Sequence, residues 1–420
     1  MGKVAIIGGG VSGASCAKLL QQRGHEVVVY EKAKVPGGLI KCTEEAGNLF
    51  HRVGGHVFNS KDAAVSDWFW SNFDKETEFL FAERNASIFF GDRFVGYPIE
   101  QYLYELDKTV ASKVIEDLLK ATNSSNRLTD YTSFYDFLVQ RFGETLCTEY
   151  FIPYNTKIWK MDLREMPLSW LDGKLPMPSV KEIIAANILR DKESGMVHSK
   201  FYYPKKGGSQ FIIDRLLHGI AVHTSEQIDK IETSERVVIN GQAYDAAIYT
   251  GDIRKISQIV TSGGDLFAQV ENLPSNGTTT VLCSCDANPY SWVYIPHKDL
   301  KCHRIIMTGN FSPNNNSADL PPNRVTCTVE FVGEVSKEVV DASISQLPFN
   351  LSPISTNFEP NSYVIQNKGA REAVDLVRGS LKTSNIWLCG RFAEWEYYNM
   401  DAAILSAMNI VGEVDARITK

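Results

Sequence analysis

The sequence of 420 residues predicts an α/β protein that combines a strand, helix and strand unit with a mainly helical insertion and an antiparallel sheet. Three observations predict this fold class. Residues 3–7 form a short apolar run, which a glycine turn and a helix-forming stretch follow. Residues 61–200 show apolar residues at the three- and four-residue spacing that is typical of helices. Residues 275–365 contain runs in which apolar and polar residues alternate, as they do in strands.

The composition fits a folded protein without a generally basic surface. Apolar residues make up 44% of the chain and charged residues 22%, which predicts one to three packed domains. The 43 Lys and Arg residues against 50 Asp and Glu residues give a formal net charge of −7. A charge of this sign does not favour a phosphate backbone, so we expect no nucleic acid partner.

No stretch of the sequence indicates a membrane span or a secreted protein. The most apolar runs end in glycine or charge well short of the ~18 residues that a span needs. The glycines at 8–10 interrupt the start before a signal-peptide core could form. The eight cysteines include no Cys-x-x-Cys pair, so we expect reduced thiols, no metal site and a cytoplasmic protein. Cys283 and Cys285 are expected to share one face of a strand, with a metal-binding fragment as the alternative.

The N-terminal glycines have the spacing of a dinucleotide-binding turn. Gly8 allows the tight turn, Gly10 lets the backbone approach a pyrophosphate, and Gly13 lets the helix pack on the strand. The helix that begins with Val11 and Ser12 would present free N–H groups and a partial positive charge to that anion. A glycine turn without a ligand is the alternative.

A second strand closes with Glu31, close to the ~20-residue spacing at which a carboxylate meets an adenosine ribose hydroxyl. Lys32 follows, and the paired glycines Gly37 and Gly38, with Leu39 after them, supply another close backbone approach. This arrangement resembles FAD enzymes of the glutathione-reductase type, especially the amine-oxidase and sugar-mutase branches. We therefore expect a Rossmann-type domain that binds FAD rather than NAD, with a simple glycine turn before a hairpin as the alternative.

The end of the chain is expected to return to this domain. A short apolar strand ends at Gly390, and Asn399 can cap a helix from about Met400 to Asp415. The N-terminus of that helix beside a flavin would stabilise negative charge, which favours the anionic reduced form. The predicted domains are a discontinuous FAD-binding domain (1–65, 203–272 and 378–420), a mainly helical domain (66–202) and an antiparallel-sheet substrate domain (273–377).

Segments spread over nearly the whole chain resemble UDP-galactopyranose mutases, and the match is best with the eukaryotic-type branch. The most specific segment is Gly390–Met400, which is close to the family's C-terminal Gly-Arg-x-Ala-Glu signature and the Tyr-Tyr-Asp-Met that ends it. The other matching segments are Gly54–Ser60, Phe151–Trp159, Trp170–Lys174, Trp292–Pro296 and His303–Pro313.

The resemblance implies a flavin site. His56 would lie near N5 of the flavin and Arg391 beside the ring, and together with Arg304 they form the predicted catalytic set. On spacing alone, His56 could equally be a loop histidine. The predicted cofactor-binding residues are Gly8, Gly10, Val11, Ser12, Gly13, Glu31, Lys32, Gly37, Gly38, Leu39, Gly54, Gly55, His56, Gly390, Arg391, Asn399 and Met400.

The resemblance also implies a nucleotide-sugar pocket. Tyr154 offers a stacking face for a base, Trp159 an apolar wall for a hexose, and Asn155 a donor to oxygens. Lys174 and Arg304 would bind the diphosphate together with tyrosine hydroxyls. The predicted substrate-binding residues are Tyr97, Tyr154, Asn155, Trp159, Lys174, Tyr294, Arg304, Tyr363 and Tyr397.

Three residues depart from the family pattern. Lys174 stands where the family places an arginine, and a lysine binds phosphate as a point charge without a bidentate fork. Phe311 stands where eukaryotic-type enzymes carry a further phosphate-contacting tyrosine, and Asn399 replaces the acid of the bacterial branch. These departures, together with Ile99 and Glu100 after Tyr97 and Pro98, leave the nucleobase and the sugar open.

The function that the resemblance implies is that of an FAD-dependent mutase. It would interconvert the pyranose and furanose forms of a nucleotide-diphosphate hexose such as UDP-galactose, through an adduct between N5 of reduced FAD and the sugar. An external reductant, NAD(P)H or another, would be a partner, and a homo-oligomer is among the options. Two other interpretations stay open: an amine-oxidase-like flavin oxidoreductase, and a non-enzymatic binding protein on the same scaffold.

Overall fold

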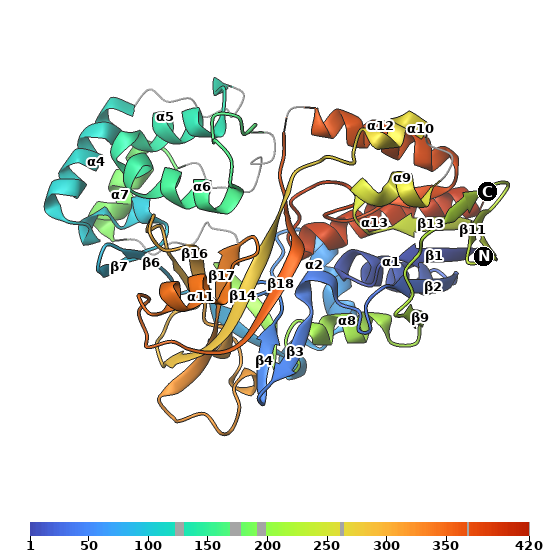
Figure 1. Ribbon diagram of the computed structural model, residues 1–420, viewed down its shortest axis with the longest axis horizontal. Helices are drawn as coiled ribbons and strands as arrows, with labels where there is room; N and C mark the ends of the chain where they lie inside the picture. Colours follow the sequence, from blue (N-terminus) through green and yellow to red (C-terminus); the bar gives the residue numbers. More distant parts are fainter. Residues whose placement is uncertain (122–129, 169–177, 191–198, 261–263, 368, 420) are drawn as a thin grey trace.

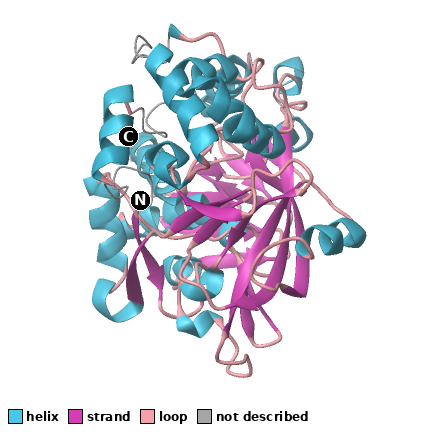
Figure 2. Cartoon of the chain, turned by 90° about the vertical axis from the view of Figure 1, so that its left-hand side faces the viewer, coloured by secondary structure: helices cyan, strands magenta, loops and turns pink. Residues whose placement is uncertain are grey.

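The computed structural model describes residues 1–121, 130–168, 178–190, 199–260, 264–367 and 369–419. A helical part at the left, a large mixed sheet in the middle and a parallel-sheet part at the right make up the molecule (Figure 1). Both termini lie at the outer end of the parallel-sheet part (Figure 1). The turned view shows the strands packed together with helices beside and above them (Figure 2).

Five parallel strands form the sheet that the N-terminal pattern predicted, in the order β19-β13-β1-β2-β9. Val4 and Ile6 pack into the hydrophobic cluster on one face, whereas Ala5 and Ile7 pack into the cluster on the other. Burial on both faces explains why this first strand is a continuous apolar run. The strands are β1 (Lys3–Ile7), β2 (Glu26–Glu31), β9 (Ala221–Thr224), β13 (Ala246–Tyr249) and β19 (Ile386–Leu388).

Separate layers cover the two faces of the parallel sheet. One face carries α1 (Val11–Gln22), α8 (Gln210–Leu217) and α13 (Met400–Ile418). The other face carries α9 (Ile256–Ile259), α10 (Gly264–Ala268), α12 (Ala370–Thr383) and a sheet of β10 (Ile231–Thr233), β11 (Val237–Ile239) and β12 (Gln242–Tyr244).

The large sheet has seven strands in the order β18-β14-β17-β16-β15-β6-β7, antiparallel except where β15 runs parallel to β6. The alternating runs of residues 275–365 form β14 to β18 of this sheet, as predicted. β18 lies at an edge of the sheet, the position at which strand prolines such as its Pro353 and Pro360 are tolerated. The strands are β6 (Ala86–Phe90), β7 (Arg93–Gly96), β14 (Ser275–Asp286), β15 (Trp292–Tyr294), β16 (Cys302–Ile306), β17 (Arg324–Val332) and β18 (Ser352–Val364).

The helical part contains an irregular turn just before a segment of functional interest. A π-helical turn at Cys147–Phe151 joins α5 to α6. Pro153 follows it and has no N–H to donate to the residue four positions earlier, so a wider turn is accommodated there. The helices are α4 (Lys108–Lys120), α5 (Phe134–Leu146), α6 (Ile152–Trp159) and α7 (Val180–Leu189).

Smaller elements connect these parts. β3 (Cys42–Glu45) pairs with β4 (Asn48–His51), and β5 (Phe79–Glu83) pairs with β8 (Lys200–Pro204). The remaining helices are α2 (Ala63–Asn72), α3 (Lys75–Glu78) and α11 (Lys337–Ile344).

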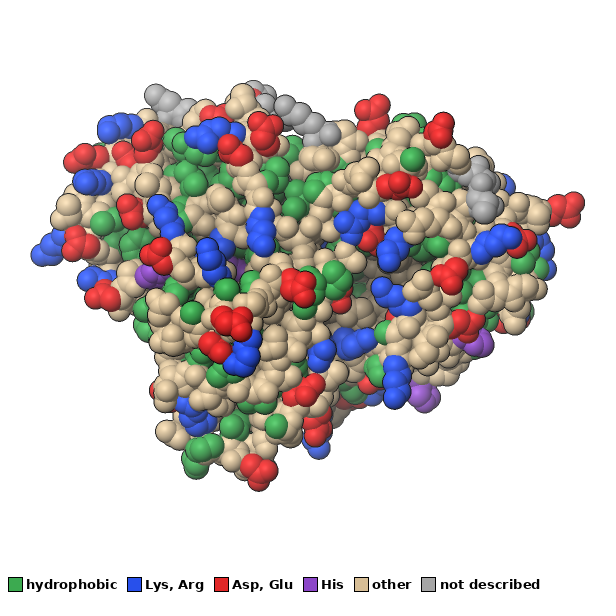
Figure 3. Space-filling view, viewed as in Figure 1, with side chains coloured by type: hydrophobic (Ala, Val, Ile, Leu, Met, Phe, Trp, Pro, Cys, Tyr) green, Lys and Arg blue, Asp and Glu red, His purple; other side chains and the backbone are tan. Residues whose placement is uncertain are grey.

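The cysteines behave as expected from their spacing. All eight are buried free thiols. Cys283 and Cys285 lie on one buried face of β14, in the same hydrophobic cluster as Cys302 and Cys327. Within the described ranges, no helix is long and apolar enough to cross a membrane. On the face shown in Figure 3, basic and acidic side chains are interspersed.

Candidate active site

The glycine turn after β1 has the geometry that the sequence predicted. Gly8 has a φ of 105°, which side chains rarely adopt. A Cβ on Gly13 would lie 1.9 Å from the Gly8 carbonyl oxygen, so glycine is required for α1 to approach the turn. Gly10 is the N-cap residue of α1, and Val11 and Ser12 form its first turn. Because Gly10 has no capping side chain, the first N–H groups of α1 are open to an anion.

Glu31 ends β2 and holds this turn in place. Its carboxylate is buried, and Oε2 accepts a hydrogen bond from the Gly9 N–H at 2.8 Å. Oε1 accepts a hydrogen bond from the Ala33 N–H at 2.7 Å. Each oxygen retains a lone pair, so the carboxylate can also accept a bond from a ribose hydroxyl.

The second pair of glycines lies directly against the first turn. The Gly37 N–H donates to the Gly9 carbonyl at 2.9 Å. A Cβ on Gly38 would lie 3.1 Å from the Cα of Gly10, so the two loops meet backbone to backbone. Lys32 is exposed and Leu39 is half-buried in the same loop. The two loops present the kind of backbone surface that a pyrophosphate can approach.

Gly390 brings the C-terminal segment to the start of α1. A Cβ on Gly390 would lie 2.3 Å from the Ser12 hydroxyl oxygen, so this approach requires glycine. Gly8, Glu31 and Gly390 follow or end three parallel strands, β1, β2 and β19. The carboxyl edge of such a sheet is where ligands bind in open α/β folds. The glycine contacts at this edge therefore fit a bound dinucleotide.

Arg391 follows and is held by backbone oxygens. Its Nη1 donates to the Ser362 carbonyl at 2.9 Å, and its Nε donates to the Tyr398 carbonyl at 3.1 Å. Asn399 occupies the N-cap position of α13 and Met400 begins that helix, but the Asn399 side chain makes no capping hydrogen bond. The predicted helix start is therefore confirmed, but Asn399 caps it through its extended backbone conformation and not, as expected, through its side chain.

The loop that carries His56 packs on the large sheet. A Cβ on Gly55 would lie 2.6 Å from Ile306 of β16, and one on Gly54 would lie 3.5 Å from a carboxylate oxygen of Glu330. His56 Nδ1 is buried and has no hydrogen-bond partner among the described residues. Burial, reinforced by nearby His51, lowers the pKa of His56 to about 3, so its imidazole is neutral. A buried ring nitrogen of this kind is available to a bound molecule.

Arg304 is a fixed cation on β16. Its Nε donates to the fully buried carboxylate of Glu330 on β17, and its Nη2 donates to the Tyr363 hydroxyl at 3.2 Å. Burial opposes the charge on Arg304, but the Glu330 carboxylate outweighs it and raises the pKa of the guanidinium. Burial likewise opposes ionisation of Glu330, while Arg304 and His303 hold the pKa of that carboxyl well below its usual range. Both partners are therefore ionised.

An aromatic group surrounds this cation. The Tyr363 and Tyr397 rings stack at 5.8 Å, and Trp159 meets them edge-on at 6.2 and 6.1 Å. The Arg391 guanidinium lies 4.8 Å from the centre of the Tyr397 ring. Arg304, Tyr363, Tyr397, Trp159 and Arg391, which come from distant parts of the sequence, are thus brought together as predicted contacts of one site. No described residue bonds to Nη1 of Arg304, so this edge of the guanidinium can reach a ligand.

A second group of tyrosines adjoins Arg304. Tyr294 lies directly opposite Arg304 in the β15–β16 pair, so the two side chains share one face of the sheet. Its ring contacts Tyr154 edge to face at 5.6 Å and Tyr97 at 4.6 Å. Burial raises the pKa of Tyr97 and Tyr154, which keeps both hydroxyls protonated as donors.

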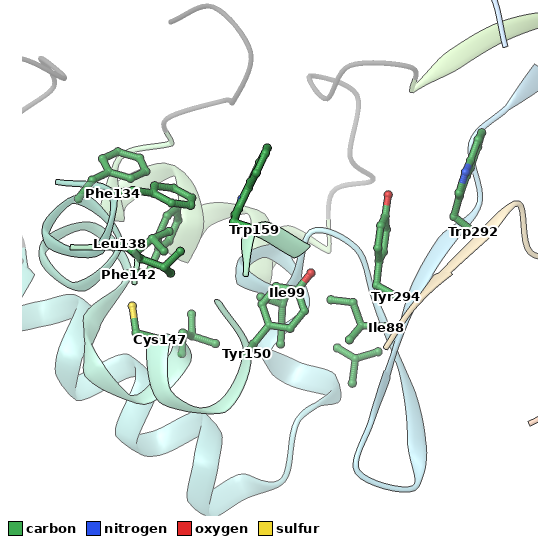
Figure 4. Packing of buried hydrophobic residues seen from close by; sticks show 14 of the residues in the cluster. Ile88, Ile99, Phe134, Leu138, Phe142, Cys147, Tyr150, Trp159, Trp292 and Tyr294 are labelled. Carbon is green, nitrogen blue, oxygen red and sulfur yellow. The ribbon is translucent and has the colours of Figure 1, made fainter. Parts of the chain in front are cut away.

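Figure 4 shows part of the hydrophobic cluster that the aromatic residues of the candidate site share with the helical part. Phe134 and Phe142 of α5 pack in the same cluster as Tyr150, Trp159 and Tyr294. The helical part and the large sheet therefore share one hydrophobic cluster beside the candidate site.

Asn155, Phe311 and Lys174 are the remaining residues that the sequence comparison singled out. Asn155 uses its side chain within its own helix, donating to the Phe151 carbonyl at 2.8 Å and accepting from Trp159 at 3.3 Å. Phe311 is buried among aromatic side chains beneath Gly55, so it serves the core. Lys174 lies outside the described residues.

Two charged residues of the site were missed by sequence reasoning. Arg84 donates to the Tyr294 hydroxyl, and its guanidinium lies 4.7 Å from the centre of the Tyr97 ring. A lone arginine before a short strand gives no signal. Glu330 does give one, because a carboxylate between Val329 and Phe331 interrupts a buried apolar strand and needs a partner there.

Comparison with known proteins first defines the N-terminal part. Residues 6–72 match the family model of the NAD(P)-binding Rossmann-like domain. This match agrees with the glycine turn, the parallel strands and the position of Glu31. Residues 6–72, which contain the end of β1 and all of α1 and β2, thus match a Rossmann-like domain.

Part of the chain is similar in sequence to a sugar-nucleotide mutase, and the whole chain is similar to another in fold. The dTDP-fucopyranose mutase of Escherichia coli is 30% identical over 183 residues, which span 42% of this chain and 46% of that protein. The crystal structure of reduced UDP-galactopyranose mutase superposes with a TM-score of 0.87 at 19% identity, over 100% of this chain and 97% of that one. A putrescine oxidase variant superposes with a TM-score of 0.67 at 13% identity, over 99% of both chains. The chain has the fold of UDP-galactopyranose mutase, as the sequence predicted.

Proposed function

We propose that this protein is a flavin-dependent mutase that interconverts the pyranose and furanose forms of a nucleotide-diphosphate hexose. The observation that carries the proposal is Arg304, a cation fixed by Glu330 and Tyr363 beside Trp159 and Tyr397. A diphosphate matches a fixed guanidinium flanked by hydroxyl donors. The similarities to UDP-galactopyranose mutase and dTDP-fucopyranose mutase support the same function.

The cofactor that we propose is FAD. Glu31 would hold the adenosine ribose, the N-terminus of α1 at Gly10 the pyrophosphate, and His56 and Arg391 the flavin ring. The second glycine loop at Gly37 and the C-terminal segment both reach the first turn, which supports FAD over a nicotinamide cofactor. Reduced flavin supplies a nucleophilic nitrogen for attack at an anomeric carbon. The active form is therefore reduced, and we propose that an external reductant maintains it.

The residues of the chain position and neutralise the substrate. Arg304 and the hydroxyls of Tyr294 and Tyr363 stabilise charge as the nucleoside diphosphate departs from the sugar. Trp159 supplies an apolar wall that holds the hexose in place for attack and reclosure. We propose that Lys174 adds a second cation.

The rival oxidoreductase is less compatible with this pocket. An amine-oxidase-like enzyme would be reduced by its own substrate in a largely apolar cavity. Here a guanidinium, its carboxylate and several tyrosine hydroxyls converge. A binding protein without a cofactor would leave the open N–H groups at the start of α1 without an anion.

The variant Arg304→Ala tests the assignment. Turnover of a nucleotide hexose should fall by about 100-fold, because one charged donor to the departing diphosphate is lost. Bound FAD, measured by its absorbance, should be unchanged, and Arg236→Ala is the control because Arg236 is largely exposed. Normal turnover in Arg304→Ala, or loss of FAD from it, would contradict the role assigned to Arg304.

A further inference from the structure

Lys157 lies in α6, between two residues of the predicted pocket, and its ammonium group does not face a ligand. Nζ donates to the backbone carbonyls of Ile295 at 2.8 Å, His297 at 2.7 Å and Cys302 at 2.9 Å. These three bonds account for all three N–H donors of an ammonium group. Lys157 is therefore not available to bind a phosphate.

The three carbonyls belong to the strand pair that carries the predicted diphosphate ligands. Ile295 directly follows β15, which bears Tyr294, and Cys302 begins β16, which bears Arg304. The ammonium group thus joins α6 to both strands at once. It bridges them where β15 ends and β16 begins.

A second side chain fixes the far end of the same helix. The Asn276 amide on β14 donates to the carbonyls of Ile158 at 3.0 Å and Trp159 at 2.9 Å. The edge-to-face contact between Tyr154 and Tyr294 lies at the same junction of helix and sheet. Tyr154 and Trp159 form the aromatic wall that α6 contributes to the predicted pocket. The position of this wall is thus set by polar bonds to the sheet.

We propose that Lys157 is a positioning residue that holds the aromatic wall of α6 at a fixed distance from Tyr294 and Arg304 on the sheet. The proposal rests on the proposed function, because the wall and the cation matter together only if one substrate spans both. Lys157 acts through the backbone of the sheet and does not touch the substrate.

The surroundings of Lys157 give the proposal a pH dependence. Burial lowers the pKa of Lys157 to about 8. Of the groups that face it, Cys302 has its pKa raised to about 12 by burial, the pKa of His297 is lowered by burial and by Lys157 itself, and Lys301 is exposed. Above about pH 8 the neutral amine has two N–H donors left for three carbonyls, so the junction loosens.

The test compares Lys157→Met with Lys160→Met, a control on an exposed lysine next to the same helix. In Lys157→Met, KM for UDP-galactose or dTDP-fucose should rise about tenfold while kcat changes by less than about threefold. Bound FAD should be unchanged. In the wild-type protein KM should rise by a similar factor between about pH 7 and pH 9.5, whereas KM of the variant should stay high and flat.

Amide hydrogen exchange of residues 154–159 separates this proposal from the proposed function. It should be about tenfold faster in Lys157→Met than in the wild type or in Lys160→Met, whatever the substrate. If the wild type converts no nucleotide hexose, the proposed function fails while the exchange result still decides whether Lys157 fixes α6. If Lys157→Met does not fold, the protection factors of residues 154–159 in the wild type at the two pH values, which are corrected for the base-catalysed intrinsic exchange rate, decide instead. Unchanged exchange and KM, or equal effects in Lys160→Met, would overturn the proposal.

Discussion

Arg304 shows how an acidic protein can hold a fixed cation at a proposed anion site. The chain has a net charge of −7, yet Arg304 is held as a cation by a buried carboxylate on the next strand. Removing either member of such a buried pair would leave the charge of the other without a partner, which is strongly destabilising. The proposed binding of a small dianion would therefore depend on a few local groups, with Arg304 and its neighbouring hydroxyls among them, and not on overall charge.

Glu31 is predicted to control cofactor retention. Glu31→Ala removes the acceptor for the N–H groups of Gly9 and Ala33, and the alanine side chain has no oxygen to replace it. We expect the FAD dissociation constant to rise by about 10- to 100-fold, the equivalent of losing about 1.5–3 kcal/mol of charged hydrogen bonding. Equilibrium dialysis against FAD measures this.

Glu26→Ala is the matched control, because Glu26 begins the same strand and its side chain is 60% exposed. A dissociation constant for Glu31→Ala within about twofold of the control would contradict the role of Glu31, since this corresponds to less than about 0.5 kcal/mol.

Individual residues could be predicted from sequence where the backbone imposes the choice. Gly8 and Gly13 could be assigned because a turn and a close contact admit no side chain there. Arg84 could not, because its role depends on aromatic rings of β15 and of the segment after β7. Asn155 looked like a ligand donor, but its side chain bonds within one helical turn, an arrangement that no motif reveals.

The α6 helix carries Tyr154 and Trp159 of the proposed pocket. Its end is fixed by Asn276, so Asn276→Ala should lower the free energy of unfolding by about 1–3 kcal/mol through the loss of two amide donors. Urea denaturation of the two proteins measures the difference. Asn323→Ala, at an exposed turn position, is the control. Equal stability of Asn276→Ala and the control would show that the contact is dispensable.

Elements with strong local patterns were predicted, and those fixed by distant pairing were not. The hairpin at Asn240 and Gly241 and the runs of β14 and β17 carry their own signals. β6 and β7 lie in a segment expected to be helical, because runs of four or five residues cannot be distinguished by periodicity. Their strand form comes from pairing with each other and with β15.

The molecule as a whole joins one Rossmann-like unit to a mixed sheet and a helical part. The strands of the parallel sheet come from three separated stretches of the chain, which the return of the C-terminal segment at Gly390 predicted. The predicted domain boundaries remain a prediction. The contact between α6 and the sheet could not be predicted, because Lys157 bonds to backbone carbonyls, which every residue type has.

Burial lowers the pKa of His51 and His56, so we expect the stability of the whole protein to depend on pH. Burial lowers the pKa of His51 to about 4 and, with a contribution from His51, that of His56 to about 3. Below about pH 6.5 the unfolded chain binds protons that the folded chain does not, so the free energy of unfolding falls as the pH falls toward 4. Each histidine adds a slope of about 1.4 kcal/mol per pH unit in that range.

Denaturation at several pH values with His51→Gln tests this dependence. The variant should lose about 1.4 kcal/mol per pH unit of the slope between about pH 6 and pH 4, since one proton fewer is taken up on unfolding. His218→Gln is the control, because His218 is exposed. The same slope in all three proteins would show that His51 does not control acid stability.

The most direct test of the central claim follows a nucleotide hexose through the protein with its flavin in each oxidation state. Purified protein is loaded with FAD, reduced anaerobically with dithionite, and mixed with UDP-galactose or dTDP-fucose, and the isomers are separated by chromatography. We predict conversion to the furanose isomer only while the flavin is reduced, with no net change in its oxidation state. Turnover that requires oxidised flavin and releases peroxide, or a colourless protein that takes up no FAD, would contradict the account.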